Sequence, residues 1–86
     1  MPQFDQVAIV TGGSRGIGRS ISAHLAAQGT AICVNYSAQS EPAEALVTEL
    51  RAGGTSAIAV QADVSDSAQA HALFDRVEVE LGPPTI

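Results

Sequence analysis

The chain has 86 residues, of which 45% are hydrophobic and 15% are charged, and its formal net charge at pH 7 is −5. This length suits one small domain, and an acidic chain without lysine offers no electrostatic footprint for a nucleic-acid partner. Its start lacks a signal-peptide pattern, no stretch approaches the ~18 apolar residues of a membrane span, and a lone Cys33 fits a reducing compartment, so we expect a cytoplasmic protein without a membrane partner.

Two strands and one helix are expected in the first part of the chain. The apolar run 7–10, closed by Thr11 and a pair of glycines, is typical of a strand buried on both faces. Isoleucine or leucine then recurs every fourth residue at 17, 21 and 25, which predicts a helix over 17–28 that Gly29 ends. The apolar run 31–34 predicts a second buried strand.

The second part repeats the alternation. Pro42 in the first turn opens a helix that ends at 53–54, with an apolar face formed by Ala43, Leu46, Val47 and Leu50. A third strand follows over 57–62. Ser65 or Ser67 then caps a last helix, which ends at 82–84 and carries the apolar residues Ala70, Leu73, Phe74, Val77 and Leu81. We expect Leu73 and Phe74 to be core residues.

Strands and helices that alternate with short connections predict an α/β fold, a Rossmann-type doubly wound parallel sheet. Residues 1–86 would form its βαβαβα half, a dinucleotide-binding half-domain. Thr85 and Ile86 follow a helix end as the earlier strands do, and in the strand order 3-2-1-4 a fourth strand pairs with the first. We therefore expect a fragment of a longer single-domain protein, truncated at the start of strand four.

The turn between the first strand and the first helix is a candidate phosphate site. It contains Gly12, Gly16 and Gly18, and glycine permits a sharp turn, a close approach of the backbone to a pyrophosphate, and tight packing of helix on strand. The helix begins near Ile17, so its free N–H groups would point at the phosphates. A glycine turn of purely structural use is the alternative. A Walker-type loop is excluded because the chain has no lysine.

The end of the second strand bears on the choice of nicotinamide cofactor. An NAD site usually has an acidic residue there for the ribose 2′-hydroxyl, but Asn35, Tyr36 and Ser37 are neutral. Arg15, just before Gly16, is placed to pair with a 2′-phosphate as a fork of donors, to which Asn35 and Ser37 would add neutral hydrogen bonds. We therefore expect NADP rather than NAD. The alternative for Arg15 is a solvated arginine in a turn.

The pattern Thr-Gly-x-x-x-Gly-x-Gly over 11–18 resembles the signature of the short-chain dehydrogenase/reductase family. The second-strand ending 34–37 is similar to that of 3-oxoacyl-(acyl-carrier-protein) reductase-like and glucose-dehydrogenase-like members. Asp63 and Val64 resemble the family's adenine-contacting pair, although Asp63 is alternatively a residue that caps the next helix. The cofactor site so expected comprises Gly12, Ser14, Arg15, Gly16, Ile17, Gly18, Asn35, Tyr36, Ser37, Asp63 and Val64.

The resemblance implies an oxidoreductase that transfers hydride between NADPH and a carbonyl or alcohol substrate, and a homo-oligomer. It also implies that the catalytic serine, tyrosine and lysine lie beyond Ile86, since Tyr36 belongs to the cofactor region. We therefore expect no turnover from these 86 residues alone. Two alternatives stay open: a stand-alone or self-associating dinucleotide-binding module, and a structural fragment that binds nothing. His24 and His71 lie on different helices and indicate no metal site.

Overall fold

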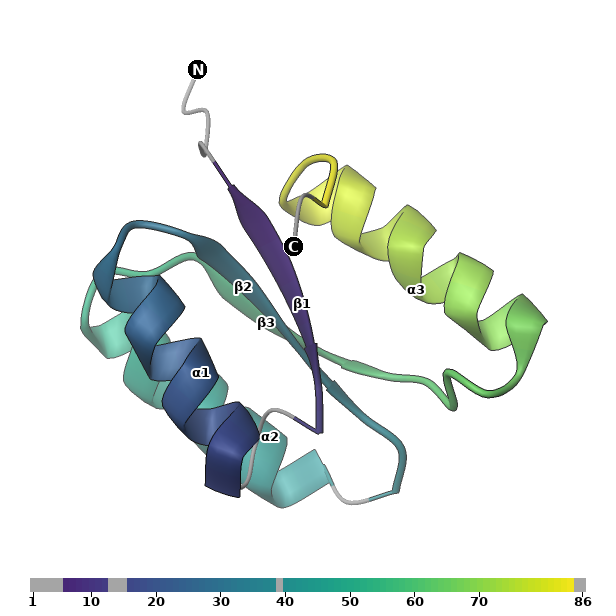
Figure 1. Cartoon of the computed structure of the whole chain (residues 1–86), viewed down its shortest axis with the longest axis horizontal. Coiled ribbons are helices and arrows are strands. Elements are labelled where there is room, and N and C mark those ends of the chain that lie inside the picture. The colour runs from purple at the N-terminus through teal and green to yellow at the C-terminus, as the bar shows by residue number, and fades with distance from the viewer. Residues whose placement is uncertain (1–5, 13–15, 39, 85–86) are drawn as a thin grey trace.

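The structure, a computed structural model, describes residues 6–12, 16–38 and 40–84. Three strands alternate with three helices in these ranges: β1 (Val7–Thr11), α1 (Gly16–Ala27), β2 (Ala31–Tyr36), α2 (Ser40–Ala52), β3 (Ala57–Gln61) and α3 (Ser67–Glu80). The strands form one parallel sheet in the order β1-β2-β3 (Figure 1). The expected βαβαβα half of a doubly wound sheet is therefore confirmed.

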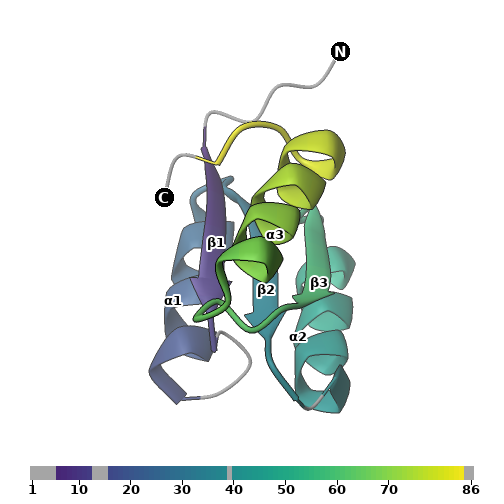
Figure 2. The same cartoon turned by 90° about the vertical axis from the view of Figure 1, so that its right-hand side faces the viewer.

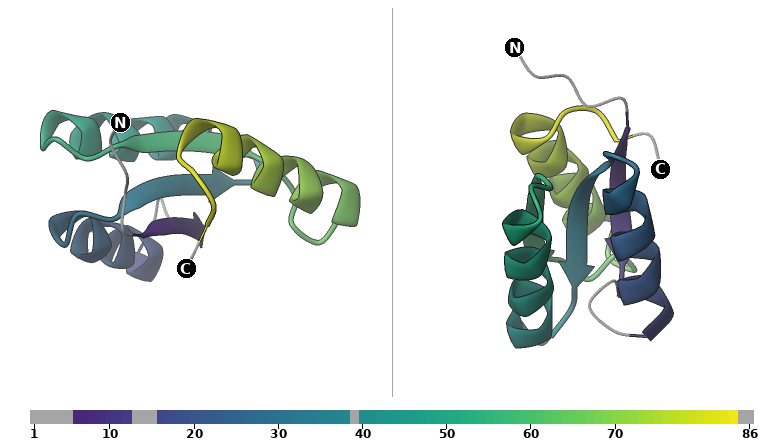
Figure 3. Two further views of the ribbon diagram at one scale, coloured as in Figure 1. Left: turned by 90° about the horizontal axis from the view of Figure 1, so that it is seen from above. Right: turned by 90° about the vertical axis from the view of Figure 1, so that its left-hand side faces the viewer.

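The sheet is the middle of three layers. Helices α1 and α2 cover one face and α3 crosses the other, as Figure 2 and the right-hand view of Figure 3 show from opposite sides. Side chains alternate between the two faces of a strand, so Cys33 joins Leu73 and Val77 of α3, whereas Ile32 and Val34 join the α2 side of the core. The central strand β2 is buried from Ala31 to Asn35.

The apolar face predicted for α2 is confirmed. Its four residues pack against the sheet: Ala43, Leu46, Val47 and Leu50. Burial of a leucine or valine side chain stabilises the fold by about 1.5–3 kcal/mol. This face therefore holds α2 against β2 and β3. An ion pair between Arg19 and Glu49 joins α2 to α1 at the surface, where such pairs contribute only about 0–1 kcal/mol.

Two expectations about burial are wrong. Phe74 is 50% exposed, because α3 contacts the sheet through Leu73 and Val77, which lie one turn apart on the same helix face, and the next residue points away from it. In β1, Ile9 and Val10 are half-buried rather than buried on both faces. The reason is that β1 is an edge strand of the described sheet.

The expected cap of α3 is also wrong. The N-cap is Asp66, which lies between the two serines that the sequence suggested. Its Oδ1 accepts hydrogen bonds from the backbone N–H groups of Ala68 at 2.9 Å and Gln69 at 3.2 Å. Aspartate and serine are about equally good N-caps, so the sequence alone does not choose among 65, 66 and 67. Among the described residues, no helix is long and apolar enough to span a membrane.

Candidate functional site

The carboxyl ends of the three strands meet at one edge of the sheet. Thr11 is paired with Asn35, and Asn35 is paired with Val60, so the strands end nearly level. Hydrogen bonds continue beyond the ladder: the Gly12 N–H donates to the Asn35 carbonyl at 3.1 Å. In open α/β sheets, ligands bind outside the carboxyl ends of the strands. This edge is therefore the candidate site, and residues of all three strand ends contribute to it.

The glycine turn joins β1 to α1 at this edge. Gly12 has φ +63° and Gly16 has φ +50°, values that L side chains rarely adopt. A Cβ at either residue would meet no atom within 4 Å, so the backbone here faces open space that a phosphate can approach. Gly16 is also the first residue of α1, whose unpaired N–H groups favour an anion. Ser14 and Arg15, predicted ligands, lie outside the described residues.

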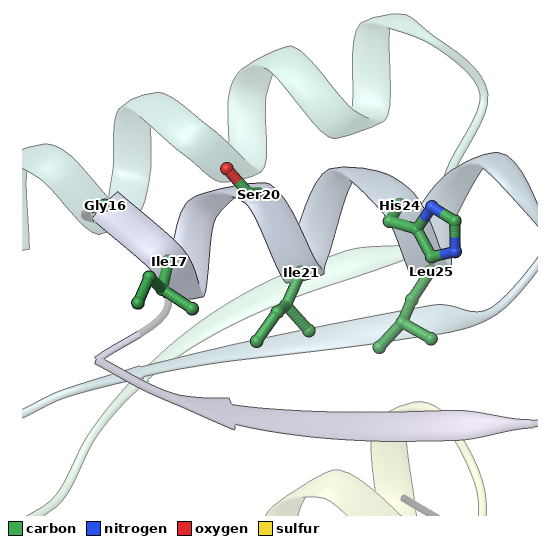
Figure 4. A pocket seen from close by; sticks show the side chains of 6 residues that line it. All are labelled: Gly16, Ile17, Ser20, Ile21, His24 and Leu25. Atoms are coloured by element: carbon green, nitrogen blue, oxygen red, sulfur yellow. The ribbon is translucent and has the colours of Figure 1, made fainter.

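Next to the turn, the face of α1 is apolar. Ile17, Ile21 and Leu25, the predicted helical stripe, point to the same side of α1, toward β1 (Figure 4). With Gly16, Ser20 and His24 they line a cavity of about 580 Å³. A second cavity lies between α1 and β1, where Gly18 is among the lining residues. Ile17 is 80% exposed, so the residue that follows the turn presents a hydrocarbon surface and not a charge.

At the end of β2 the predicted ligands take different positions. Asn35 is only 3% exposed, and its Nδ2 donates to the carbonyls of Val60 and Ala62, both at 3.2 Å. Both amide hydrogens are thus used inside the protein, in place of the hydrogen bond to a cofactor that we expected. Tyr36 is half-buried against the α2 side of the core, and Ser37 is exposed. No carboxylate occurs at 35–37.

The segment after β3 is held by its own hydrogen bonds. Asp63 Oδ1 accepts from the Ser65 hydroxyl at 2.6 Å and from the Ser65 N–H at 3.0 Å, and these bonds hold the pKa of Asp63 below its usual range. The Asp63 N–H donates to Gln69 Oε1 at 2.8 Å. Since Asp66 caps α3, the alternative interpretation of Asp63 as the helix cap is wrong. Val64 is 46% exposed beside it.

Gln69 is a site-supporting residue that the sequence did not reveal to us. Its position offered a signal, because a glutamine three residues after an N-cap often reaches back to a backbone N–H before the helix. Here it reaches Asp63, three residues further back than the cap itself. If Ser65 or Ser67 were the N-cap, Gln69 would not be the third residue after the cap.

The thiol of Cys33 is buried in the core, and the two histidines lie on helices. Cys33 is buried, and burial raises the pKa of its thiol to about 12, so it stays protonated at neutral pH. His24 Nε2 lies 3.1 Å from Gln28 Nε2, and His71 is exposed. In the part of the chain that the structure describes, no three His, Cys, Asp or Glu side chains are grouped for a metal ion.

Comparison with known proteins indicates the family in which this arrangement occurs. The family model described as short chain dehydrogenase matches residues 6–84. The chain is 45% identical over 75 residues to the 3-oxoacyl-(acyl-carrier-protein) reductase of Staphylococcus aureus, a match that covers 87% of this chain and 30% of the relative. It is 40% identical to the NADPH-dependent aldehyde reductase-like protein, chloroplastic, of Arabidopsis thaliana, with 98% of this chain and 34% of that protein covered.

Solved structures agree. A blue fluorescent protein from a metagenomic library, solved in complex with NADPH, superimposes with a TM-score of 0.86 at 48% identity, covering 93% of this chain and 33% of that one. The chain thus spans roughly a third of the length of the relatives it matches. The glycine spacing, the strand order and the family model point the same way: this chain belongs to the short-chain dehydrogenase/reductase family.

Proposed function

We propose that this chain binds the adenosine and pyrophosphate part of NADP(H) at the carboxyl edge of its sheet. The observation that carries the proposal is the glycine turn, in which Gly12 and Gly16 have left-handed backbone conformations, leave open space where a side chain would stand, and lead into the N-terminus of α1. A pyrophosphate placed there would receive backbone N–H groups and the positive end of the helix dipole. The Asp63–Val64 segment would contact the adenine.

Two observations support NADP(H) over NAD(H). No carboxylate stands at Asn35, Tyr36 or Ser37 to bind a free ribose 2′-hydroxyl or to repel a 2′-phosphate. Arg15 in the turn supplies a planar, always charged fork that matches a phosphate. In addition, the similar blue fluorescent protein was solved in complex with NADPH, and the similar protein of Arabidopsis thaliana is named as NADPH-dependent.

The family suggests the reaction to which this half-site contributes. NADPH, when bound, supplies a hydride for a carbonyl substrate, and NADP accepts one from an alcohol. The residues of this chain would bind and orient the cofactor. Acid–base chemistry would come from elsewhere in the protein, since the chain has no lysine and Tyr36, its one tyrosine, lies at the cofactor edge. The single buried thiol suits a cytoplasmic location.

Calorimetric titration with NADPH and NADH tests the cofactor assignment. We expect Arg15→Ala to weaken NADPH binding by about 1–3 kcal/mol, because a charged hydrogen bond to the 2′-phosphate is lost, and to leave NADH almost unchanged. Arg51→Ala is the matched control: it also removes one arginine, but from the last turn of α2, and should change neither affinity. Equal losses of both cofactors in Arg15→Ala would contradict the role of Arg15.

An assay of NADPH oxidation with a simple ketone tests whether this chain binds the cofactor without catalysing the reaction. We expect no ketone-dependent rate from this chain, because it carries no acid–base lysine. If the proposal is correct, this chain binds NADPH but does not oxidise it. A rate that survives removal of contaminating enzymes would contradict it, and an absence of NADPH binding would favour a purely structural role.

A further inference from the structure

Asn35 connects the two segments to which the cofactor is assigned. It lies in the central strand, so its backbone faces β1 on one side and β3 on the other. Its carbonyl accepts the Gly12 N–H at 3.1 Å, at the start of the glycine turn. Its side-chain amide donates to the carbonyls of Val60 and Ala62 at 3.2 Å, and Ala62 immediately precedes Asp63. One residue is therefore hydrogen-bonded to the start of the glycine turn and to the residue that precedes Asp63.

Asn35 is buried, so its side-chain amide depends on the hydrogen bonds that it makes inside the protein. Residues 31–34 of the same strand are apolar, and Asn35 is nearly as buried as they are, with 3% of its surface exposed. A buried amide destabilises a fold unless its hydrogen bonds are made. Here both donors point at carbonyls at the very end of β3, one of them beyond the last residue of the strand. The amide thus adds two side-chain hydrogen bonds at the end of β3, where the backbone N–H of Ala62 also donates to the Tyr36 carbonyl at 2.9 Å.

We propose that Asn35 is a positioning residue that sets the spacing between the pyrophosphate-binding turn at Gly12 and the adenine-binding segment Asp63–Val64. The inference rests on the proposed function. The ribose that joins the pyrophosphate to the adenine allows only a limited range of separations between them, so the two segments must stand within that range. Errors of about 1 Å in such a site cost substantial affinity or rate. Asn35 touches no part of the ligand and acts through the two segments that do.

Asn35→Leu tests this role, since leucine is of similar size and lacks both donors. The probe is adenosine 2′,5′-bisphosphate, which carries the adenine and the 2′-phosphate and needs no nicotinamide site. We expect its affinity to fall about tenfold, the order of one lost hydrogen bond in free energy. Arg51→Met is the matched control, because it removes a side-chain bond to the Ala57 carbonyl, 2.8 Å long, at the opposite edge of the same sheet. It should leave the affinity unchanged.

A double-mutant cycle separates positioning from general stability. If Asn35 acts through the segment at Asp63, its substitution in an Asp63→Ala background should change the affinity by less than about twofold, because interacting sites are non-additive. A merely structural role would give additive losses. Backbone NMR shifts should change at Asp63 and Val64 in Asn35→Leu without ligand. Asn35→Ser, which is smaller and cannot reach both carbonyls, serves if the leucine variant does not fold.

The outcomes distinguish the two proposals. If the unsubstituted chain binds the bisphosphate and both Asn35 variants bind it within twofold, the positioning role is wrong while the proposed function stands. If the unsubstituted chain does not bind the bisphosphate at all, the proposed function fails and the positioning role fails with it. A tenfold loss confined to the Asn35 variants, with shifts at Asp63 and Val64, supports both.

Discussion

At the scale of single residues, one buried hydroxyl in the middle of α1 lowers the stability of the fold. Ser22 is fully buried, and among the described residues its Oγ has no hydrogen-bond partner. A buried donor left unsatisfied costs about 1–3 kcal/mol, and serine also has a lower helix propensity than alanine. The sequence offers no warning of this, since a serine between Ile21 and His24 is as compatible with the solvent face as with the core.

We therefore expect Ser22→Ala to raise the free energy of unfolding by about 1–3 kcal/mol, measured by urea denaturation. Ser20→Ala is the control, because Ser20 is exposed on the same helix and its replacement gains only the difference in helix propensity, about 0.5 kcal/mol. If the two variants gain the same amount, the buried hydroxyl carries no penalty and the stabilisation is propensity alone.

At the scale of single elements, the N-cap residue determines where α3 begins. The start of α3 depends on Asp66, whose side chain accepts from two first-turn N–H groups and whose negative charge lies at the positive end of the helix dipole. The neighbouring serines have other positions: Ser65 binds Asp63, and Ser67 is already the first helical residue. The cap lies two residues after Val64, the end of the segment that we propose contacts the adenine, and it holds the start of α3.

Asp66→Ala should lower the free energy of unfolding by about 0.5–2 kcal/mol, because two N–H groups lose their acceptor. Ser67→Ala is the matched control at the next residue and should cost a few tenths of a kcal/mol at most, since an exposed residue inside a helix tolerates alanine well. Thermal unfolding followed by circular dichroism measures both. A larger cost for Ser67→Ala would show that the cap lies one residue later than the structure places it.

At the scale of the whole molecule, the described sheet has an open side. β1 lies at one edge of the sheet, and beside it the apolar side chains of α1 are exposed, Ile17 by 80% and Ile21 by 45%. Apolar side chains exposed beside the edge of a sheet provide a hydrophobic driving force for association. A second copy of this chain would cover these side chains if the two copies met through the same patch about a twofold axis, the commonest arrangement of homodimers.

We accordingly expect the chain to self-associate reversibly, and Ile21→Glu to weaken the association at least about tenfold, since a buried isoleucine contributes about 1.5–3 kcal/mol. Sedimentation equilibrium measures the effect. Val79→Glu is the control: Val79 is 86% exposed on α3, on the opposite face of the sheet. A chain that stays monomeric at every concentration, or an equal loss in the control, would contradict association through this edge.

Most of the fold could be predicted from the sequence because its signals are local. Alternating apolar runs and helical stripes, interrupted by glycine and proline, determine the order and type of the elements. The glycine spacing over 11–18, because it falls between a strand and a helix, predicts a phosphate-binding turn. The lack of an acidic residue at the end of the second strand is likewise visible in the sequence, and it carries the preference for NADP that we propose.

The tertiary structure decided the questions that depend on neighbours distant in the chain. Only the packing of α3 shows that Phe74 is exposed, and only the register of β2 against β3 shows that the Asn35 amide faces carbonyls at the end of β3 instead of a ligand. Burial and hydrogen-bond partners are properties of pairs of segments, here about 25 residues apart. Composition and periodicity determined what the elements are, and the register between strands decided what Asn35 does.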